Sequence, residues 1–180
     1  MEKTQSASLF PSNSIDLKSR VSAFVHTRIG TVLCLLLSAG LAWFLTEHVL
    51  VTTTPSLSQR VFWRSYDQAG IATVKRGDYV IFDQYLPEPR KETRSVIKRV
   101  ACGPGDTLSV KDDYYYCNGQ YLGMAKHKTI MGSTLTPFVY NGVVPKGSVF
   151  ALGDHKDSYD CRYYGFKDIS KLNARAWAIF

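Results

Sequence analysis

The longest apolar stretch of the chain lies near its N-terminus. From Ile29 to Thr46 no residue is charged, and Leu, Val, Ala and Gly dominate. At about 1.5 Å of rise per residue, a helix of these 18 residues would be roughly 27 Å long, close to the hydrocarbon thickness of a bilayer. We therefore expect residues 29–46 to form a transmembrane anchor.

Two other interpretations of this stretch stay open. A buried core helix is one, although no amphipathic partner helix follows in the sequence. A cleaved signal peptide is the other, with Ser38-Ala39-Gly40 as its small-residue cleavage site. The segment before the apolar stretch is long for a signal peptide, and apolar residues continue past that site. The uncleaved anchor explains the pattern best.

The charges beside the apolar stretch predict its orientation. Arg28 precedes it and Glu47 follows it, and the positive-inside rule keeps the basic flank in the cytoplasm. Residues 1–28 are then a cytoplasmic tail, and residues 47–180 form a domain on the far side of the membrane. The formal net charge of the chain is only +7, without a basic cluster interleaved with aromatics. We therefore expect a lipid bilayer, and no nucleic acid, as a partner.

After residue 50 the pattern changes to short apolar segments separated by Gly and Pro. The segments that read as strands are Tyr79–Phe82, Ser95–Ile97, Leu108–Val110, Tyr114–Cys117, Ser148–Leu152 and Ala174–Phe180. Asp112-Asp113 marks a turn, and Asn118-Gly119 is a strong hairpin signal. This predicts a mainly β domain of short antiparallel strands. Residues 120–145 fit the pattern least well and are expected to form an inserted lobe or loop.

The four cysteines, at positions 34, 102, 117 and 161, do not have metal-ligand spacing. Cys34 lies in the apolar stretch and is interpreted as a small hydrophobe. In an exported domain Cys102 and Cys117 can form a disulfide, although spacing alone does not prove that they pair. The four histidines are scattered. We expect no metal site and no cofactor.

Three polar segments together indicate a serine nucleophile that is activated by a lysine. They are T-T-T-P-S-L-S around Ser56, K-R-V-A-C-G-P-G-D from Lys98, and G-D-H-K-D-S-Y-D-C-R over residues 153–162. A serine hydroxyl needs a neighbour that accepts its proton. A lysine with a pKa of about 10.4 is neutral in only about one molecule in 2,500 at pH 7, so burial must lower that pKa. Val96, Ile97 and Val100 can provide part of an apolar wall around Lys98.

The order of these segments, with G-D-Y-V-I-F between the first two, resembles the signal peptidase I family over about residues 30–180. The shortness of the chain resembles the TraF-type peptidases of conjugative plasmid transfer. The second and third segments are the specific part of the resemblance, and the serine segment is weaker. The resemblance implies a β fold, an N-terminal membrane anchor and a Ser/Lys dyad. Ser56 matches the nucleophile and Lys98 the general base.

The resemblance also implies supporting roles. Ser158 matches the serine that orients the base, and Asp160 and Arg162 match a structural ion pair. The hydroxyl of Thr54 and the backbone N–H of Ser56 match the donors to the oxyanion. Thr52 or Thr53 would replace Thr54 if the register were shifted. Cys161 is interpreted as a packing residue rather than a thiol nucleophile.

The resemblance further implies that an extended substrate lies against the strand formed by Tyr79, Val80, Ile81 and Phe82, by β-augmentation. The sequence departs from the family pattern at several positions, which bear on substrate specificity more than on the dyad. These are Ser58 in place of proline, Arg60 in place of glycine, His155-Lys156 in place of Asn-Arg, and Cys161 in place of serine.

The resemblance predicts a serine endopeptidase, anchored by a single span in the bacterial inner membrane, with a cytoplasmic N-terminus and a periplasmic catalytic domain. It would cleave the signal peptide of a preprotein, expected to be a propilin or another component of a conjugation apparatus. Other conjugation or secretion components are further candidate partners. A general leader peptidase and a non-catalytic scaffold of a secretion complex are the alternatives. Release by water or by an amine, which would give ligation or cyclisation, is left open by the sequence.

Overall fold

The fold is given by a computed structural model, which describes residues 22–23, 27–87 and 91–180. The chain divides into two compact units, Met1–Thr46 and Glu47–Phe180. Most of the predicted cytoplasmic tail, residues 1–21 and 24–26, lies outside the described residues.

The apolar stretch forms the helix α2 (Arg28–His48), which contains the predicted span 29–46. Among the described residues it is the one helix long and apolar enough to cross a membrane, by length and composition. Its large side chains are exposed, for example Leu37 at 73%. A core helix would bury them, so the helix is consistent with a membrane-anchored protein.

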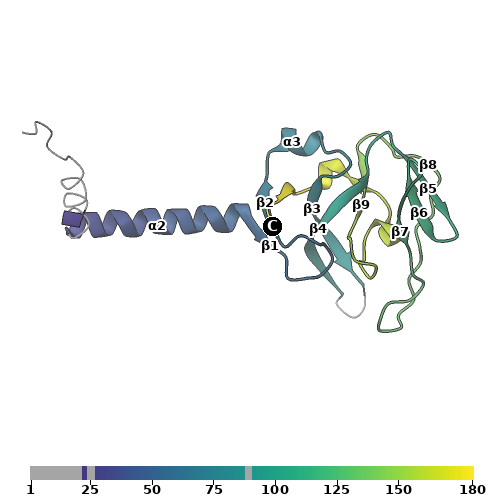
Figure 1. The fold of residues 1–180 in the computed structure, drawn as a ribbon, viewed down its shortest axis with the longest axis horizontal. Coiled ribbons are helices and arrows are strands. Elements are labelled where there is room, and N and C mark those ends of the chain that lie inside the picture. The colour runs from purple at the N-terminus through teal and green to yellow at the C-terminus, as the bar shows by residue number, and fades with distance from the viewer. Residues whose placement is uncertain (1–21, 24–26, 88–90) are drawn as a thin grey trace, which may run out of the picture. The chain divides into compact units, whose positions relative to one another are not determined.

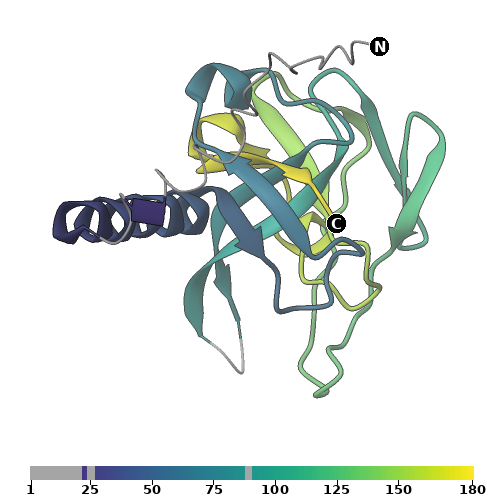
Figure 2. The same ribbon diagram turned by 60° about the vertical axis from the view of Figure 1, so that its left-hand side comes forward.

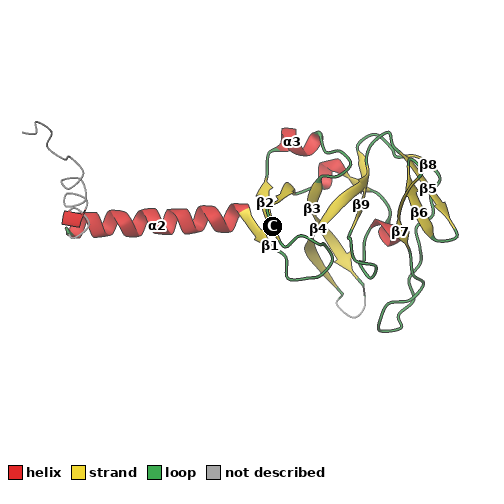
Figure 3. Ribbon diagram, viewed as in Figure 1, coloured by secondary structure: helices red, strands yellow, loops and turns green. Residues whose placement is uncertain are grey.

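The second unit is built from antiparallel β-strands, as predicted, and Figure 3 shows how they dominate it. A seven-stranded sheet has the order β1-β2-β11-β3-β4-β9-β10. Its strands are β1 (Val49–Val51), β2 (Val61–Ser65), β3 (Tyr79–Leu86), β4 (Glu92–Cys102), β9 (Ser148–Leu152), β10 (Lys167–Asp168) and β11 (Ala174–Ala178). The helical turns between them are α3 (Gln68–Ala72), α4 (Cys161–Tyr164) and the 3₁₀ turn η1 (Ile169–Lys171).

A four-stranded sheet has the order β7-β6-β5-β8. Its strands are β5 (Thr107–Lys111), β6 (Tyr114–Cys117), β7 (Gln120–Met124) and β8 (Gly142–Val143). Residues 120–145, expected as a lobe or loop, therefore supply two of its strands. Asn118 and Gly119 form the predicted hairpin turn, with φ angles of 48° and 79°. Both angles are positive, as a two-residue type I′ turn requires, and Asn-Gly is a residue pair that this turn strongly prefers.

The seven-stranded sheet curls, as can be followed in Figures 1 and 2. β1 is the first strand in the order and β9 is the sixth. Yet the segment after β1 meets the segment after β9, where the His155 N–H donates to the Ser56 carbonyl at 3.2 Å. Two stretches that are distant along the sheet are thereby brought together.

Two hydrophobic clusters hold this arrangement. The larger joins the two sheets, with Val100 and Phe150 packing in one cluster with Leu108 and Tyr115. The smaller cluster consists of Leu57, Phe62, Ile81, Ile97, Ala174 and Ala176. Cys102 of β4 is also bonded to Cys117 of β6, so a disulfide links the two sheets covalently.

Candidate active site

Lys98 lies on β4 and is almost fully buried, with 4% of its surface exposed. Its Nζ donates a hydrogen bond to Ser158 Oγ at 2.7 Å. Burial lowers the pKa of this ammonium, the charge of Asp160 opposes the shift, and Arg162 reinforces it. The net result is a pKa below that of an ordinary lysine. A larger share of Lys98 is therefore neutral and able to accept a proton.

Ser56 lies in a turn after β1, and its Oγ is 3.0 Å from Thr54 Oγ1. Within the described part of the chain, no hydrogen bond joins Ser56 Oγ directly to Lys98 Nζ. The two residues nevertheless line one cleft of about 460 Å³. Catalytic hydrogen bonds are often long before substrate binds and tighten in the complex.

Hydrophobic packing explains why Ser56 and Lys98 reach the same cleft. Leu57 follows Ser56, and Ile97 precedes Lys98. Leu57 and Ile97 are buried in the same small cluster. Because Leu57 and Ile97 are held in this cluster, the adjacent residues Ser56 and Lys98 are held where they line the cleft.

The hydrogen bonds of this segment favour Thr54 over Thr52 as the residue whose hydroxyl lies beside Ser56. Thr54 lines the cleft together with Ser56. The hydroxyl of Thr52 instead donates to the carbonyls of Gln59 and Arg60, at 3.4 and 3.3 Å. Thr52 therefore holds together the two ends of residues 52–60, the loop that carries Ser56, which we call the serine loop.

Close packing at the centre of the site requires a glycine at position 153. A Cβ added at this position would lie 2.2 Å from Ser158 Oγ and 2.7 Å from the Ser56 carbonyl oxygen. Only a residue without a side chain lets these two segments approach so closely.

Asp160 and Arg162 form a buried ion pair beneath the site. Both Asp160 oxygens accept from the guanidinium, Oδ1 from Nε at 2.9 Å and Oδ2 from Nη2 at 2.7 Å. Asp160 Oδ2 also accepts from the Gly153 N–H at 3.0 Å, and Arg162 Nη1 donates to the Met124 carbonyl at 2.8 Å. The pair thus ties β7 of the small sheet to the loop that carries Ser158.

Ser58, which departs from the family pattern, has a structural explanation. Its backbone N–H and hydroxyl both donate to Asp154 Oδ2, at 3.1 and 2.9 Å. Arg99 donates to the other oxygen, Oδ1, at 3.1 Å through Nη2. Burial alone would raise the pKa of Asp154, but these hydrogen bonds outweigh it and the pKa is lowered. Asp154 therefore connects the serine loop to the residue that follows Lys98.

We expect Ser58→Pro to lower the free energy of unfolding by about 1–3 kcal/mol, because it removes both donors to a partly buried carboxylate. Ser58→Ala keeps the N–H and is expected to cost less. Because the folded-state pKa of Asp154 is depressed, this stability is present above the ordinary aspartate pKa and is lost as the pH falls through the lowered value. Urea unfolding at neutral and acidic pH measures both effects. A Ser58→Pro variant as stable as the native chain would contradict this role.

The predicted substrate strand needs correction. Tyr79, Val80 and Ile81 pair with β4 on one side and with β11 on the other. Val80, Ile81 and Phe82 are also buried, with at most 6% exposed. Both edges of β3 are occupied at Tyr79, Val80 and Ile81, so no substrate strand can add to β3 at these three residues.

The neighbouring strand β4 has an edge that is available. Its pairing with β3 extends over Glu92–Arg99, whereas its pairing with β9 begins only at Arg99. Among the described residues, the second edge of β4 before Arg99 has no strand partner. Val96 and Lys98 on this strand line the cleft.

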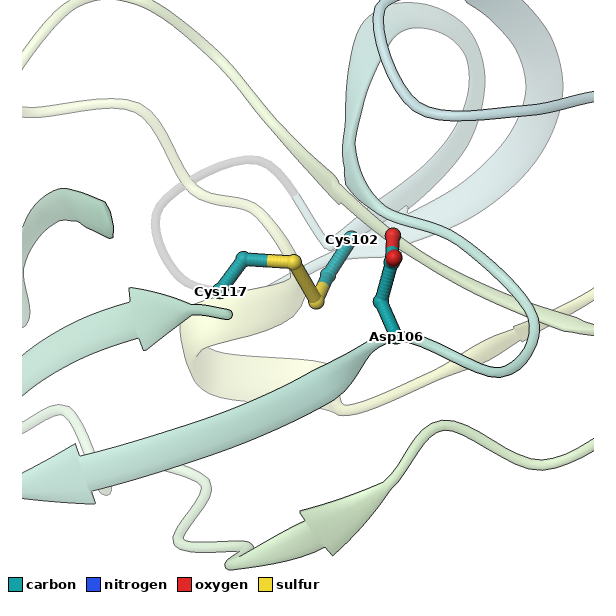
Figure 4. A group of neighbouring side chains, drawn as sticks. All are labelled: Cys102, Asp106 and Cys117. Atoms are coloured by element: carbon teal, nitrogen blue, oxygen red, sulfur yellow. A yellow bond between two sulfur atoms is a disulfide. The ribbon is translucent and has the colours of Figure 1, made fainter. Parts of the chain in front are cut away.

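Two other sets of residues are candidates for chemistry: Cys161 as a thiol nucleophile, and the group of Cys102, Asp106 and Cys117 as metal ligands. The surroundings of each argue against that role. Cys161 is fully buried, and burial raises the pKa of its thiol to about 12, so it is neutral at pH 7. Among the described residues, Cys102, Asp106 and Cys117 are the one group close enough to share a metal ion. Figure 4 shows that the two sulfurs are bonded to each other, which removes them as thiolate ligands.

Several cleft residues were missed by sequence reasoning. Thr129, Ile130 and Leu135 come from the poorly patterned segment 120–145, and Leu86 and Pro87 come from the end of β3. Nothing in their local sequence marks them, because they reach the cleft only through the tertiary fold.

The β domain thus has a serine and a buried lysine in one cleft. A comparison with known proteins identifies its family. The family model described as "Signal peptidase, peptidase S26" matches residues 24–180. The chain therefore belongs to the signal peptidase family, peptidase S26, which is a family of serine endopeptidases.

Individual relatives are bacterial signal peptidases. The chain is 33% identical over 128 residues to signal peptidase I of Bacillus caldolyticus, covering 63% of this chain and 65% of that protein, just under two thirds. It is 31% identical over 159 residues to signal peptidase I T of Bacillus subtilis (strain 168), covering 81% and 78%. A crystal structure of a signal peptidase I from Enterococcus faecalis V583 is 30% identical, with a TM-score of 0.35, and covers 56% of this chain and 93% of that one.

Proposed function

We propose that the chain is a membrane-anchored serine endopeptidase that cleaves signal peptides from exported preproteins with Ser56 and Lys98. The observation that carries the proposal is the buried lysine, with its lowered pKa, in one cleft with the candidate nucleophile. Family membership supports the reaction class.

In the proposed mechanism, neutral Lys98 accepts the proton of Ser56 Oγ as this oxygen attacks the carbonyl carbon of the scissile bond. In this proposal the Thr54 hydroxyl, which is 3.0 Å from Ser56 Oγ, and the Ser56 N–H donate to the oxyanion and stabilise it. Protonated Lys98 then gives its proton to the leaving amine, and an acyl-enzyme remains. Water then attacks the ester while neutral Lys98 accepts its proton, and Lys98 returns this proton to Ser56 Oγ as the signal peptide is released. Ser158 holds the lysine amine through its 2.7 Å hydrogen bond.

The substrate is proposed to extend along the open edge of β4 before Arg99. This edge offers unpaired backbone groups to an extended peptide, and it leads directly to Lys98. Addition of a strand there places a peptide carbonyl in the cleft that contains Ser56.

The catalytic domain is proposed to lie on the periplasmic side of the bacterial inner membrane, with the N-terminus in the cytoplasm. Arg28 and Glu47 at the ends of the apolar stretch support this orientation. The Cys102–Cys117 bond supports it independently, because disulfides persist in oxidising compartments.

The preprotein can belong to one of two groups. A propilin or another component of a conjugation apparatus is the group that the resemblance to the TraF-type peptidases implies. A general range of preproteins is supported by relatives that carry the name signal peptidase I. Co-expression of the chain in membranes with a propilin and, separately, with a general secretory precursor tests both. Cleavage of the propilin alone favours the first group, cleavage of both favours the second, and cleavage of neither supports a non-catalytic scaffold.

The activity should depend on pH through Lys98. Only the neutral amine accepts a proton, so kcat/KM rises with pH up to the pKa of Lys98 in the folded protein. Because burial lowers that pKa, we expect the midpoint of the rise to lie below the value of about 10.4 for an ordinary lysine. The lowered pKa also means that folding loses stability as the pH falls from the ordinary value toward the folded one. A pH profile of kcat/KM with a peptide substrate measures the midpoint, and a midpoint at or above the ordinary value would contradict the assignment.

A further inference from the structure

Residues 125–137 form a short, defined hairpin, which we call the cleft hairpin. Lys128 and Thr134 form a β-bridge. The Leu135 N–H donates to the His127 carbonyl at 2.8 Å, which closes the hairpin below this bridge. Gly132 makes the turn at its tip with a φ of 86°, a backbone angle that glycine adopts readily.

The base of the cleft hairpin is fastened to the segment that carries the candidate site. Lys126 Nζ forms an ion pair with Asp157, the residue before Ser158. The Lys126 N–H donates to the hydroxyl of Tyr163 at 3.0 Å. Just beyond the other end of the hairpin, the Phe138 N–H donates to the Arg162 carbonyl at 2.7 Å. The hairpin and the residue that orients Lys98 are therefore mechanically connected.

The cleft hairpin presents aliphatic side chains to the cleft. Ile130 and Leu135 line it together with Ser56 and Lys98. Ile130 is 85% exposed, so most of its apolar surface is available for contact. A large apolar side chain at the mouth of a cleft is a feature of binding sites, whereas the same side chain on an open surface needs no explanation.

We infer that the cleft hairpin is a recognition element, on which an aliphatic side chain of the substrate's signal segment packs against Ile130 and Leu135. This inference rests on the proposed function. The substrate is favoured over the bilayer as the occupant, because these two side chains line the cleft that contains the nucleophile. Met131, the next residue, is 74% exposed and is not among the residues that line the cleft. It therefore provides a matched control.

The test uses the full chain in detergent micelles and two soluble peptides that span a signal cleavage site. One peptide keeps an aliphatic residue near the scissile bond, and the other has serine there. We expect Ile130→Asp to lower kcat/KM for the aliphatic peptide at least 10-fold and to change the serine peptide by less than 3-fold. Met131→Asp should change neither by more than 2-fold. Lys126→Met, which releases the base of the hairpin, should reproduce the selective loss.

A small acylating ester separates recognition from chemistry and from folding. Its reaction with Ser56 needs the dyad but no peptide contact, so Ile130→Asp should react at the native rate. Equal losses for both peptides, or equal losses in Ile130→Asp and Met131→Asp, would overturn the inference. Vesicle binding that weakens equally in both variants, with peptide kinetics unchanged, would assign the hairpin to the bilayer instead. If the ester does not react with the native chain either, the proposed function itself fails.

Discussion

Replacement of Lys98 with alanine is expected to reduce signal-peptide cleavage by roughly four to six orders of magnitude, as does removal of a member of a catalytic unit in other serine peptidases. The reason is that Lys98 Nζ is the buried amine in the cleft that contains Ser56. Lys98→Arg should be equally inactive, because a guanidinium stays protonated and cannot act as the base. Initial rates with a peptide substrate measure the loss.

The controls separate lost chemistry from lost structure. Lys111→Ala removes an exposed lysine on β5 and should leave the rate unchanged. Removing Lys98 leaves the buried pair of Asp160 and Arg162 intact, so thermal unfolding should show a folded protein. A Lys98→Ala variant that is folded and retains more than a tenth of the native rate would exclude Lys98 as the base.

The second large effect concerns stability. Asp160→Ala should lower the free energy of unfolding by about 3–5 kcal/mol, because it leaves the guanidinium of Arg162 buried without its carboxylate. The Gly153 N–H loses its acceptor in the same variant. Urea unfolding of the native and variant chains measures the difference.

Two comparisons show whether burial is the cause. Glu92→Ala breaks the exposed ion pair between Arg94 and Glu92, which should cost no more than about 1 kcal/mol. The double variant Asp160→Ala with Arg162→Met removes both charges and should recover part of the loss. If Asp160→Ala costs no more than Glu92→Ala, the buried pair does not hold the site together.

Sequence patterns were most informative where local chemistry determines local structure. The apolar stretch 29–46 predicted α2, and the Asn118-Gly119 dipeptide predicted a hairpin because both residues adopt positive φ. Periodicity of apolar residues likewise predicted the mainly β fold. In each case the determining interaction lies within a few residues of the signal.

Features that depend on the tertiary fold were not predicted. Whether a strand edge is free depends on which strands pair. The resemblance assigned Tyr79–Phe82 to the substrate, although Tyr79, Val80 and Ile81 have strand partners on both sides. Ile130 and Leu135 reach the cleft through a hairpin anchored by Asp157, about thirty residues away along the chain. The role of Ser58 depends likewise on Asp154 in a distant loop.

The connection through Asp154 and Arg162 suggests how the site keeps its geometry without a direct bond between Ser56 and Lys98. Asp154 holds the serine loop, and Arg162 holds the loop of Ser158. The two loops meet at Gly153, where the absence of a side chain is required. Placement of the candidate nucleophile and the candidate base therefore depends on residues that surround them, such as Asp154 and Arg162.

The most direct test of the central claim is the mass of the acyl-enzyme. A peptide substrate that spans a signal cleavage site is mixed with the native chain, and the reaction is stopped rapidly with acid. We predict a covalent adduct with the mass of the signal fragment, mapped by peptide sequencing to Ser56 and absent from Ser56→Ala. Cleavage that proceeds with an adduct on another residue, or that persists in Ser56→Ala, would contradict the account.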